Sequence, residues 1–427
     1  MVPNLTAALT HPLLALEAKV LAKEVEIEQW FRAQWAEHTP PFYSSVDLRN
    51  AGFKLAPVDT NLFPGGFNNL NRECLPLCVQ AAMSAIEKFC PDAKKLLLIP
   101  ESHTRNQFYL QNVIALSRIL RHTGLEVRLG SVLPEITEPT TITLDNGAQL
   151  VLEPLVRSRH RLGLKDFDPC AILLNNDLSG GVPAVLEGLH EQTLLPPLHA
   201  GWHVRRKSHH FAAFRDVAAQ FATVAGIDPW LIDPAFGVCG GLDFQAREGE
   251  ACLAETVDQV LSRIREKYLE YGVAERPFVI VKADAGTYGM GVMTVHDAAE
   301  VTHLNRKQRN KMAVGKEGLQ VHEVIIQEGV HTLETVGGSV AEPVVYMIDR
   351  YVVGGFYRVN PARGRDENLN APGMHFEPLG FESPCQLPDP ASHPDDAPNR
   401  FYTYGVVARL AALAAAIELE RTAPEEL

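Results

Sequence analysis

The feature that most constrains the fold is a buried strand that ends in a lysine and runs directly into a glycine-rich turn. Residues 278–282 read Phe-Val-Ile-Val-Lys, and Ala-Asp-Ala-Gly-Thr-Tyr-Gly-Met-Gly-Val follows. Glycines allow the backbone to approach a ligand and turn its N–H groups toward an anion, while a lysine supplies a point charge. The segment therefore predicts a phosphate site. The alternative is a plain glycine hairpin beside an exposed lysine.

The glycine spacing excludes two common phosphate-binding loops. The glycines are Gly286, Gly289 and Gly291, in the order G-x-x-G-x-G. A P-loop needs Gly-Lys-Ser/Thr after the turn, and a dinucleotide-binding turn reads G-x-G-x-x-G. The segment therefore matches neither of these two loops.

Two later segments supply parts that such a site needs. Gln327, Glu328 and Val330 follow an apolar pair and are suited to line an adenine and ribose subsite with backbone and carboxylate groups. Arg358 lies on a predicted strand, where it could contact a phosphoryl group during transfer. The alternative for residues 327–330 is an ordinary strand end. The alternative for Arg358 is an exposed arginine without a ligand.

A short run of oxygen-bearing side chains predicts a magnesium site. Glu367, Asn368 and Asn370 lie one or two positions apart. Mg²⁺ prefers a few protein oxygens together with phosphate oxygens. A turn is the alternative structure for this run.

Composition limits the classes of partner. The chain has 427 residues with 39 Lys and Arg against 52 Asp and Glu, giving a net charge of −13. Duplex nucleic-acid binders normally carry a basic excess, so no nucleic-acid partner is expected. No uncharged apolar run reaches the length of a membrane span, and residues 404–419 are expected to form a buried helix.

The N-terminus and the cysteines suggest a cytoplasmic protein. Residues 1–4 show no basic cluster leading into an apolar segment, so no secretory signal is expected. The seven cysteines are odd in number and lack paired CxxC spacing, which favours reduced thiols.

Hydrophobic periodicity predicts an α/β part followed by an α+β part. In the first part we expect helices over 12–38, 77–89 and 105–122, strands over 96–99, 125–129 and 171–175, and a hairpin over 141–153. After a break at residues 194–197 we expect a helix over 253–270, strands over 278–282 and 323–327, a strand pair over 344–360 and an irregular loop over 383–398. The predicted domains are 1–195 and 196–427, with a lid subdomain at about 275–330.

The order of these pieces between about residues 200 and 380 resembles the ATP-grasp carboxylate-amine ligases. Lys282, Glu328 and Arg358 match the loop lysine, hinge glutamate and strand arginine of that superfamily, and Asn368 or Asn370 matches its magnesium cluster. Lys207 stands where a second ATP lysine usually precedes the loop; a basic helix cap is its alternative role.

The N-terminal half narrows the resemblance to the proteobacterial glutamate-cysteine ligases of ATP-grasp type. The segments that carry it are 43–69, 198–207 and 355–360, which are dense in polar residues among turns. Arg105 follows a predicted strand end, where open α/β sheets bind ligands. The expected substrate contacts are Asp47, Arg49, Asp59, Asn61, Asn68, Arg105 and Arg206.

The resemblance implies that ATP and Mg²⁺ drive the joining of glutamate, through an acyl phosphate at its γ-carboxylate, to cysteine. Lys282 and Arg358 would be the catalytic groups. The chain departs from the superfamily at Ala283, where proline is frequent, and at the asparagines of the metal cluster. If Glu367 points away, Asp349 or Glu342 is the next candidate ligand.

Three alternatives remain at this point: another ATP-grasp ligase such as a glutathione-synthetase-like enzyme, an ATP-dependent kinase, or a nucleotide-binding protein without turnover. The expected partners are small molecules, and a homo-oligomer is left open.

Overall fold

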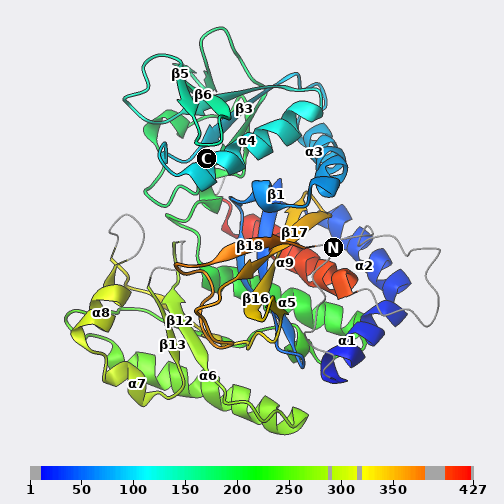
Figure 1. Ribbon diagram of the computed structural model, residues 1–427, viewed down its shortest axis with the longest axis vertical. Coiled ribbons are helices and arrows are strands. Elements are labelled where there is room, and N and C mark those ends of the chain that lie inside the picture. Colours follow the sequence, from blue (N-terminus) through cyan, green and yellow to red (C-terminus); the bar gives the residue numbers. More distant parts are fainter. Residues whose placement is uncertain (1–10, 287–290, 315–319, 380–399, 425–427) are drawn as a thin grey trace.

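The computed structural model describes residues 11–286, 291–314, 320–379 and 400–424. Within them, three larger sheets and their covering helices build the molecule (Figure 1). This arrangement confirms the predicted combination of α/β and α+β parts.

An antiparallel sheet that combines strands from the N-terminal part of the chain with strands after residue 334 occupies the middle of the molecule. Its order is β18-β17-β16-β1-β2, and β15 pairs with β16. Every pairing in it is antiparallel. The bounds are β1 (Tyr43–Asn50), β2 (Leu55–Asn61), β15 (Thr335–Val336), β16 (Ser339–Ile348), β17 (Tyr351–Val359) and β18 (His375–Pro378). We refer to it as the central sheet.

A largely parallel sheet forms the upper part of Figure 1, with order β10-β9-β3-β4-β6-β5. β9 is buried at all five positions, as expected for a strand covered on both faces. The bounds are β3 (Lys95–Pro100), β4 (Glu126–Ser131), β5 (Thr140–Thr143), β6 (Gln149–Pro154), β9 (Ala171–Asn175), β10 (Thr193–Leu195), α3 (Leu75–Phe89) and α4 (Gln107–His122); β7 (Val156–Ser158) and β8 (Arg161–Gly163) form a separate pair. α3 also packs against β16 and β17, which joins this sheet to the central one.

An antiparallel sheet of four strands, which we call the lid sheet, lies at the lower left of Figure 1 with order β11-β14-β12-β13. The bounds are β11 (Phe236–Cys239), β12 (Val279–Ala283), β13 (Val292–Val295), β14 (Val324–Glu328), α6 (Glu250–Tyr271), α7 (Ala299–Thr302) and α8 (Arg306–Ala313). α6 packs against β11, β12 and β14.

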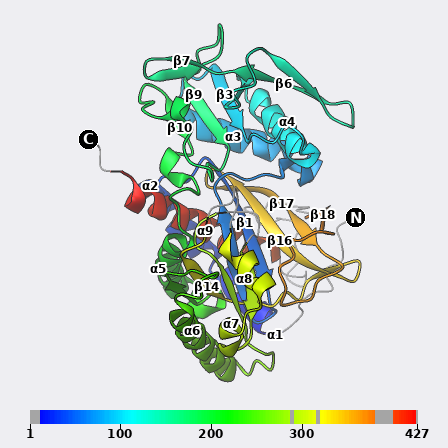
Figure 2. The ribbon, with the colours of Figure 1, turned by 90° about the vertical axis from the view of Figure 1, so that its left-hand side faces the viewer.

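Four helices pack around the central sheet: α1 (His11–Ala22), α2 (Glu24–Glu37), α5 (Lys207–Ala225) and α9 (Arg400–Thr422). α9 contacts α5 and the strands β1, β2, β16 and β17, and Figure 2 shows it passing through the interior. It is long and apolar enough to cross a membrane by length and composition alone, but 89% of its apolar window is buried inside the protein. The predicted buried helix over 404–419 is confirmed.

Most predicted elements are present with shifted ends. The helix over 12–38 is instead two helices that meet at Lys23, and the hairpin over 141–153 turns at Gly147, where φ is 81°. The predicted helix start at Arg105 is two residues early, because Asn106 caps α4 by accepting from the Tyr109 N–H. The predicted loop over 383–398 lies outside the described residues.

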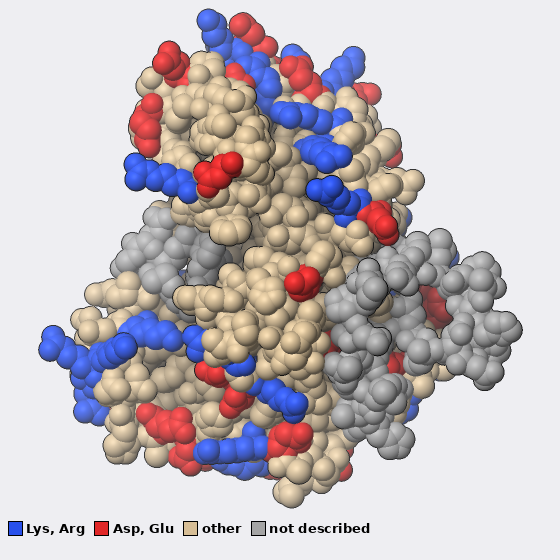
Figure 3. Space-filling model, in the orientation of Figure 1, with Lys and Arg blue, Asp and Glu red and all other residues tan. Residues whose placement is uncertain are grey.

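The domain division at residues 195 and 196 remains a prediction. The parallel sheet ends with β10 just before that point, whereas β1 and β2 come from before it and complete a sheet with strands that come after it. On the face shown in Figure 3, acidic and basic side chains are interspersed over the upper and lower parts.

A buried ion network fastens α5 to α9. Arg205 makes two hydrogen bonds of 2.8 Å to the Glu418 carboxylate, and His210 Nδ1 lies 3.1 Å from the same group. Arg205 also donates to the Thr60 carbonyl at 2.9 Å, which ties the helix pair to β2. Burial opposes ionisation of Glu418, but Arg205 and His210 together hold its pKa at about 2.

Replacement Glu418→Gln is expected to lower the free energy of unfolding by about 3 kcal/mol, because it leaves the Arg205 charge buried and unpaired. Since the folded pKa lies below the ordinary value of 4.5, this stabilisation is complete above that pH and is lost as the pH falls toward 2. Urea unfolding at neutral pH and near pH 4 measures both effects.

The matched control is Asp216→Asn, which removes an exposed ion pair between the same two helices, Asp216 with Arg421 at 3.1 Å. An exposed pair contributes at most about 1 kcal/mol. Equal losses in both variants would contradict the role given to the buried network.

Candidate functional site

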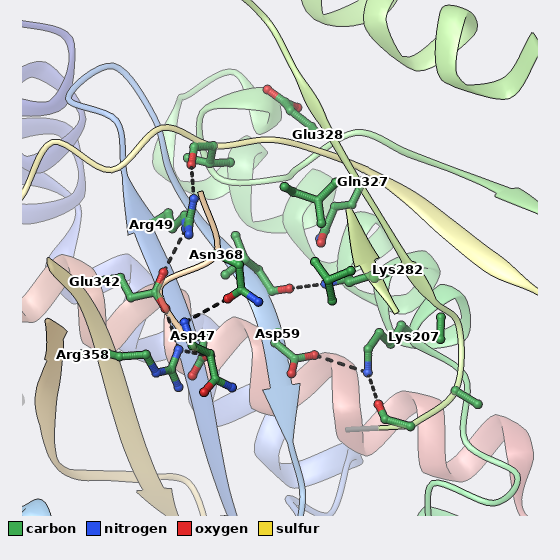
Figure 4. Close-up of a pocket in the computed structure, with 18 residues that line it drawn as sticks. Asp47, Arg49, Asp59, Lys207, Lys282, Gln327, Glu328, Glu342, Arg358 and Asn368 are labelled. Atoms are coloured by element: carbon green, nitrogen blue, oxygen red, sulfur yellow. Dashed lines mark hydrogen bonds and ion pairs between the residues drawn. The ribbon is translucent and has the colours of Figure 1, made fainter. Parts of the chain in front are cut away.

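A pocket lies between the central sheet and the lid sheet, with about 850 Å³ of empty space that includes the part open to solvent (Figure 4). Apolar side chains with a few convergent polar groups line it, as is typical of small-molecule sites. Its lining comes from both sheets, from the first residue of α5 and from the loop after β17: Asp47, Arg49, Val58, Asp59, Lys207, Ile280, Lys282, Ala283, Ala285, Gly286, Val292, Gln327, Glu328, Val330, Glu342, Arg358, Asn368 and Asn370.

Lys282 lies on β12 and points from the lid sheet toward the central sheet (Figure 4). Its Nζ donates to the Val58 carbonyl of β2 at 2.7 Å. Burial lowers the pKa of Lys282 to about 8, with Lys207 acting in the same direction and Asp59 in the opposite one. A lysine in this setting gains its full charge when an anion enters the pocket.

Lys207 is the first residue of α5 and brings a second amine to the same end of the pocket. Its Nζ donates to the Gly286 carbonyl at 2.7 Å and lies 3.8 Å from an Asp59 oxygen. Burial lowers the pKa of Lys207, and Asp59 opposes that shift. The predicted phosphate lysines, which are 75 positions apart in sequence, are therefore brought together.

The start of the glycine-rich loop is fastened to α5. Asp284 accepts hydrogen bonds from the Ser208 N–H at 2.8 Å and from its hydroxyl at 2.6 Å. The backbone N–H of Lys207 donates to the Asp284 carbonyl at 2.8 Å. Asp284 thus caps the helix and fixes where Gly286 enters the pocket.

The two side chains at the end of β14 point in opposite directions, as strand alternation requires. Glu328 turns away from the pocket, where its carboxylate meets Lys54 Nζ at 2.9 Å, Trp230 Nε1 at 3.2 Å and the Ala235 N–H at 2.9 Å. These three groups hold the carboxylate while Glu328 still lines the pocket, so its contact with a ribose stays a prediction. The buried Lys54 holds that carboxylate on the far side of the strand.

Gln327 faces the pocket from the neighbouring position. It is 2% exposed, and its side-chain Nε2 has no hydrogen-bond partner among the residues that the structure describes. An unpaired buried amide is costly, and a ligand can satisfy it. Two residues further along, Gly329 is required because a Cβ there would come within 2.1 Å of the Phe278 ring.

Across the pocket, the central sheet presents a row of charges. Antiparallel register places Glu342 opposite Arg358 and Asp47 opposite Asp59. Arg358 Nη1 donates to Asp47 at 2.7 Å and to Glu342 at 2.5 Å. Its Nε is buried and unpaired within the described chain. Arg358 therefore combines a fixed position with spare donor capacity toward the pocket.

The acids of this row titrate differently. Burial raises the pKa of Asp47, and the neighbouring Glu342 adds to the rise, which Arg358 opposes. Burial also opposes ionisation of Glu342, but Arg49 and Arg358 lower its pKa. Asp59 has a lowered pKa because Lys207 and Lys282 outweigh its burial.

Arg49 lines the pocket and makes three hydrogen bonds to separate segments. It donates to Glu342 at 2.9 Å, to the Val330 carbonyl at 3.2 Å and to the Glu367 carbonyl at 2.6 Å. The guanidinium thus ties β1 to the hinge after β14 and to the loop after β17. Its predicted role as a substrate contact stays a prediction. The three hydrogen bonds give Arg49 a structural role, because they connect three segments of the pocket wall.

The three residues of the predicted metal cluster lie around a neighbouring hollow under α8, and Asn368 and Asn370 also line the pocket. The Glu367 carboxylate accepts from Arg363 Nη1 at 3.0 Å and from the Gly364 N–H at 2.7 Å. Its role as a metal ligand stays a prediction. Among the described residues no group of three His, Cys, Asp or Glu side chains forms a metal site.

Several other predicted residues lie away from the pocket. Asn61 closes a turn with Phe63, Asn68 donates to Asn69, Arg206 pairs with Glu323 and Arg105 is exposed. Gly291 does not line the pocket, and Gly289 lies outside the described residues. The segment 61–68 is dense in polar residues because it builds turns.

The apolar lining was missed from the sequence. Ile280, Val292 and Val58 flank the pocket beside the charged groups. Strand alternation places Ile280 on the same face as Lys282, which is a signal that could have identified it. Val58 could not be found this way, because its place depends on the pairing of distant strands.

The chain is similar to known proteins over nearly its whole length. A family model described as glutamate-cysteine ligase matches residues 17–419. A crystal structure from Methylobacillus flagellatus KT, named as a candidate gamma-glutamylcysteine synthetase, is 67% identical, covers 99% of each chain and has a TM-score of 0.91.

Two further solved structures match weakly. D-cycloserine synthetase DcsG is 13% identical over 76% of this chain and 82% of its own, with a TM-score of 0.35. D-alanyl-alanine synthetase A from Vibrio cholerae O1 is 10% identical over 74% and 81%, with a TM-score of 0.31. No curated protein matches this chain.

The lowered pKa of Lys282 predicts unusual reactivity. Acetylation by acetic anhydride, followed across pH by peptide mass spectrometry, should show Lys282 with a midpoint near pH 8 because its neutral amine forms there. Lys267 is the internal control: Asp228 and Glu270 overcome its burial and raise its pKa. Identical midpoints for the two lysines would contradict the electrostatic description of the pocket.

Proposed function

The chain belongs to the glutamate-cysteine ligase family and forms γ-glutamylcysteine at the expense of ATP, and from this premise we propose that the pocket in Figure 4 transfers a phosphoryl group from ATP to the γ-carboxylate of glutamate. The observation that carries the proposal is the meeting of Lys207, Lys282 and Arg358 at one pocket. Three cationic groups around one cavity suit a triphosphate and its transfer chemistry.

The nucleotide would lie along the lid sheet. Ile280 and Val330 offer an apolar surface to the base, and Gln327, which pairs with Ile280 across β12 and β14, supplies an amide beside it. Lys282 and Lys207 stand at the other end, near Gly286, where the phosphates would lie. This orientation agrees with the hinge and loop roles expected for an ATP-grasp site.

The chemical difficulty is charge, because a carboxylate must approach a polyanion. Lys207, Lys282 and Arg358 reduce the repulsion and stabilise the charge on the equatorial oxygens during transfer. The oxygen of the γ-carboxylate forms a bond to the γ-phosphorus while the bond to ADP breaks. The cysteine amine then attacks the acyl carbon, and phosphate leaves. No side-chain nucleophile is required.

The pocket contains a donor set that suits Mg²⁺. Asp47 and Glu342 bring two carboxylates to one end of Arg358, and Asn368 and Asn370 face the same cavity. Burial opposes the ionisation of both carboxylates, and a bound cation would stabilise their charged forms. Carboxylate and amide oxygens are ligands that Mg²⁺ prefers. Glu342 thus takes the place first given to Glu367. A bound Mg²⁺ would neutralise phosphate oxygens during transfer.

Acyl phosphates are destroyed by water, so the site must exclude it. The start of the glycine-rich loop is held by Asp284 and by the bond from Lys207 to Gly286. Lys207 must exchange that bond for one to phosphate when ATP enters. We propose that this exchange couples nucleotide binding to closure of the loop.

Asp59 is the best candidate to bind a substrate ammonium group. Its carboxylate is 39% exposed within the pocket and its pKa is lowered. An acid at the phosphate end is unsuited to hold a phosphate, whereas the ammonium of an amino acid would complete its surroundings. The partners proposed are glutamate, cysteine and ATP. A cytoplasmic location is proposed from the odd number of cysteines and their lack of paired CxxC spacing.

The function is tested by supplying Mg-ATP and glutamate with and without cysteine, measuring ADP and detecting the product by mass spectrometry. Cysteine-dependent ADP release with γ-glutamylcysteine is expected. Turnover with a different amine only would overturn the substrate, and ADP release with a stable phosphorylated product would indicate a kinase.

The metal assignment predicts a contrast between two glutamates. Glu342→Gln should raise the Mg²⁺ concentration for half-maximal activity by about tenfold or more, because a charged ligand is lost. Glu367→Gln is the matched control and should leave it within about twofold, since that carboxylate does not line the pocket and forms an exposed ion pair with Arg363. A larger effect at Glu367 would reverse the assignment.

The position of the Gln327 side-chain amide predicts that this residue affects the KM for ATP. Gln327→Leu should raise the KM for ATP by about three- to tenfold, because one hydrogen bond to the base is lost, while the KM for glutamate stays unchanged. Initial-rate kinetics with each substrate varied separately measure this. An equal change in both constants would show that Gln327 acts on the fold of the pocket.

A further inference from the structure

Two cysteines of the lid sheet lie in contact outside the pocket. Cys239 is the last residue of β11, and Cys252 lies in the first turn of α6. Their sulfur atoms are 2.8 Å apart. Neither residue lines the pocket, and neither has a role in the proposed mechanism.

The two thiols differ in access. Cys239 is 1% exposed, whereas Cys252 is exposed at the start of a helix. Thiol–disulfide exchange requires one thiolate that the reagent can reach and a second thiol near enough to displace it. Burial and the neighbouring Cys252 raise the pKa of Cys239 to about 12, so Cys252 is the thiol that reacts first.

We propose that Cys239 and Cys252 form a reversible dithiol–disulfide site that reacts with small-molecule disulfides, the class that includes cystine, the oxidised form of the amino-acid substrate. The choice of cystine as the reagent rests on the proposed function. The pairing of Cys239 with Cys252 rests on the contact between their sulfur atoms.

The reaction balances without another reagent. The Cys252 thiolate attacks one sulfur of cystine, the cystine S–S bond breaks and one cysteine leaves. The Cys239 thiol then loses its proton, attacks the Cys252 sulfur and releases the second cysteine. The protein loses two hydrogen atoms as the new S–S bond forms, and cystine is reduced to two cysteines.

The bond would join the edge strand of the lid sheet to the helix behind it. β11 pairs with β14, placing Cys239 opposite Val324 and Phe236 opposite Gln327, and α6 packs on both strands. The crosslink would therefore join α6 to β11 three positions from Phe236, the residue that lies opposite Gln327.

A second pair provides the comparison. Cys90 and Cys170 also contact each other, but both are only partly exposed and Cys170 donates to the Lys95 carbonyl at 3.5 Å. The double variant Cys90→Ser, Cys170→Ser removes that pair and leaves Cys239 and Cys252 unchanged.

The test is to titrate the folded double variant with cystine, count free thiols and map crosslinks by peptide mass spectrometry. We expect the loss of two thiols, a Cys239–Cys252 crosslink and full recovery with a reducing agent. Adding Cys252→Ser, a change at an exposed position, should abolish both the thiol loss and the crosslink.

Three outcomes would overturn the proposal: all thiols persist, the crosslink joins other cysteines, or Cys252 stops at a mixed disulfide with cysteine. None of these readouts requires turnover, so ligase assays on the reduced enzyme test the proposed function separately.

Discussion

The antiparallel pairing of β1 with β16 is the interaction on which the rest of the site depends. It brings a strand from the first 50 residues beside one from near residue 345. The register of β2 and β17 on either side then sets Asp59, Asp47, Glu342 and Arg358 across one face of the sheet. A shift of one residue would turn these side chains to the opposite face, among the apolar residues that pack on α9. Stability and function therefore rest on the same register.

Opposite charges balance across the pocket before any ligand binds. The central sheet supplies the acids and Arg358, while the lid sheet and α5 supply Lys282 and Lys207. Each cation has an internal partner: Lys282 binds the Val58 carbonyl, and Lys207 binds that of Gly286. Such contacts keep buried charges tolerable in the empty enzyme. In the proposed function, a triphosphate would replace them with stronger charge-assisted bonds. The differential contacts of the lysines thus provide a reason for the glycine-rich loop to respond to ATP.

The local sequence pattern predicted most helices and strands. Which side chains meet at the pocket depends on how distant strands pair. Apolar runs located β3, β9, β12 and β14, because buried strands and turn residues leave a signal in the nearby sequence. The phosphate lysines and Arg358 could also be found, since residue type and strand position limit their chemistry. The directions of Glu328 and Glu367 could not. Glu328 is turned by the buried Lys54, and Glu367 is held by a turn through Gly364. Both depend on contacts that local pattern does not encode, as does the placing of β1 in the central sheet.

The most direct measurement of the central claim is to follow oxygen from the γ-carboxylate of glutamate. Glutamate labelled there with a heavy oxygen isotope is incubated with the enzyme, Mg-ATP and cysteine, and the released phosphate is analysed by mass spectrometry. If the pocket transfers the γ-phosphoryl group to that carboxylate, each phosphate released will carry one labelled oxygen. Unlabelled phosphate, formed together with γ-glutamylcysteine, would show that no acyl phosphate forms and would contradict the account.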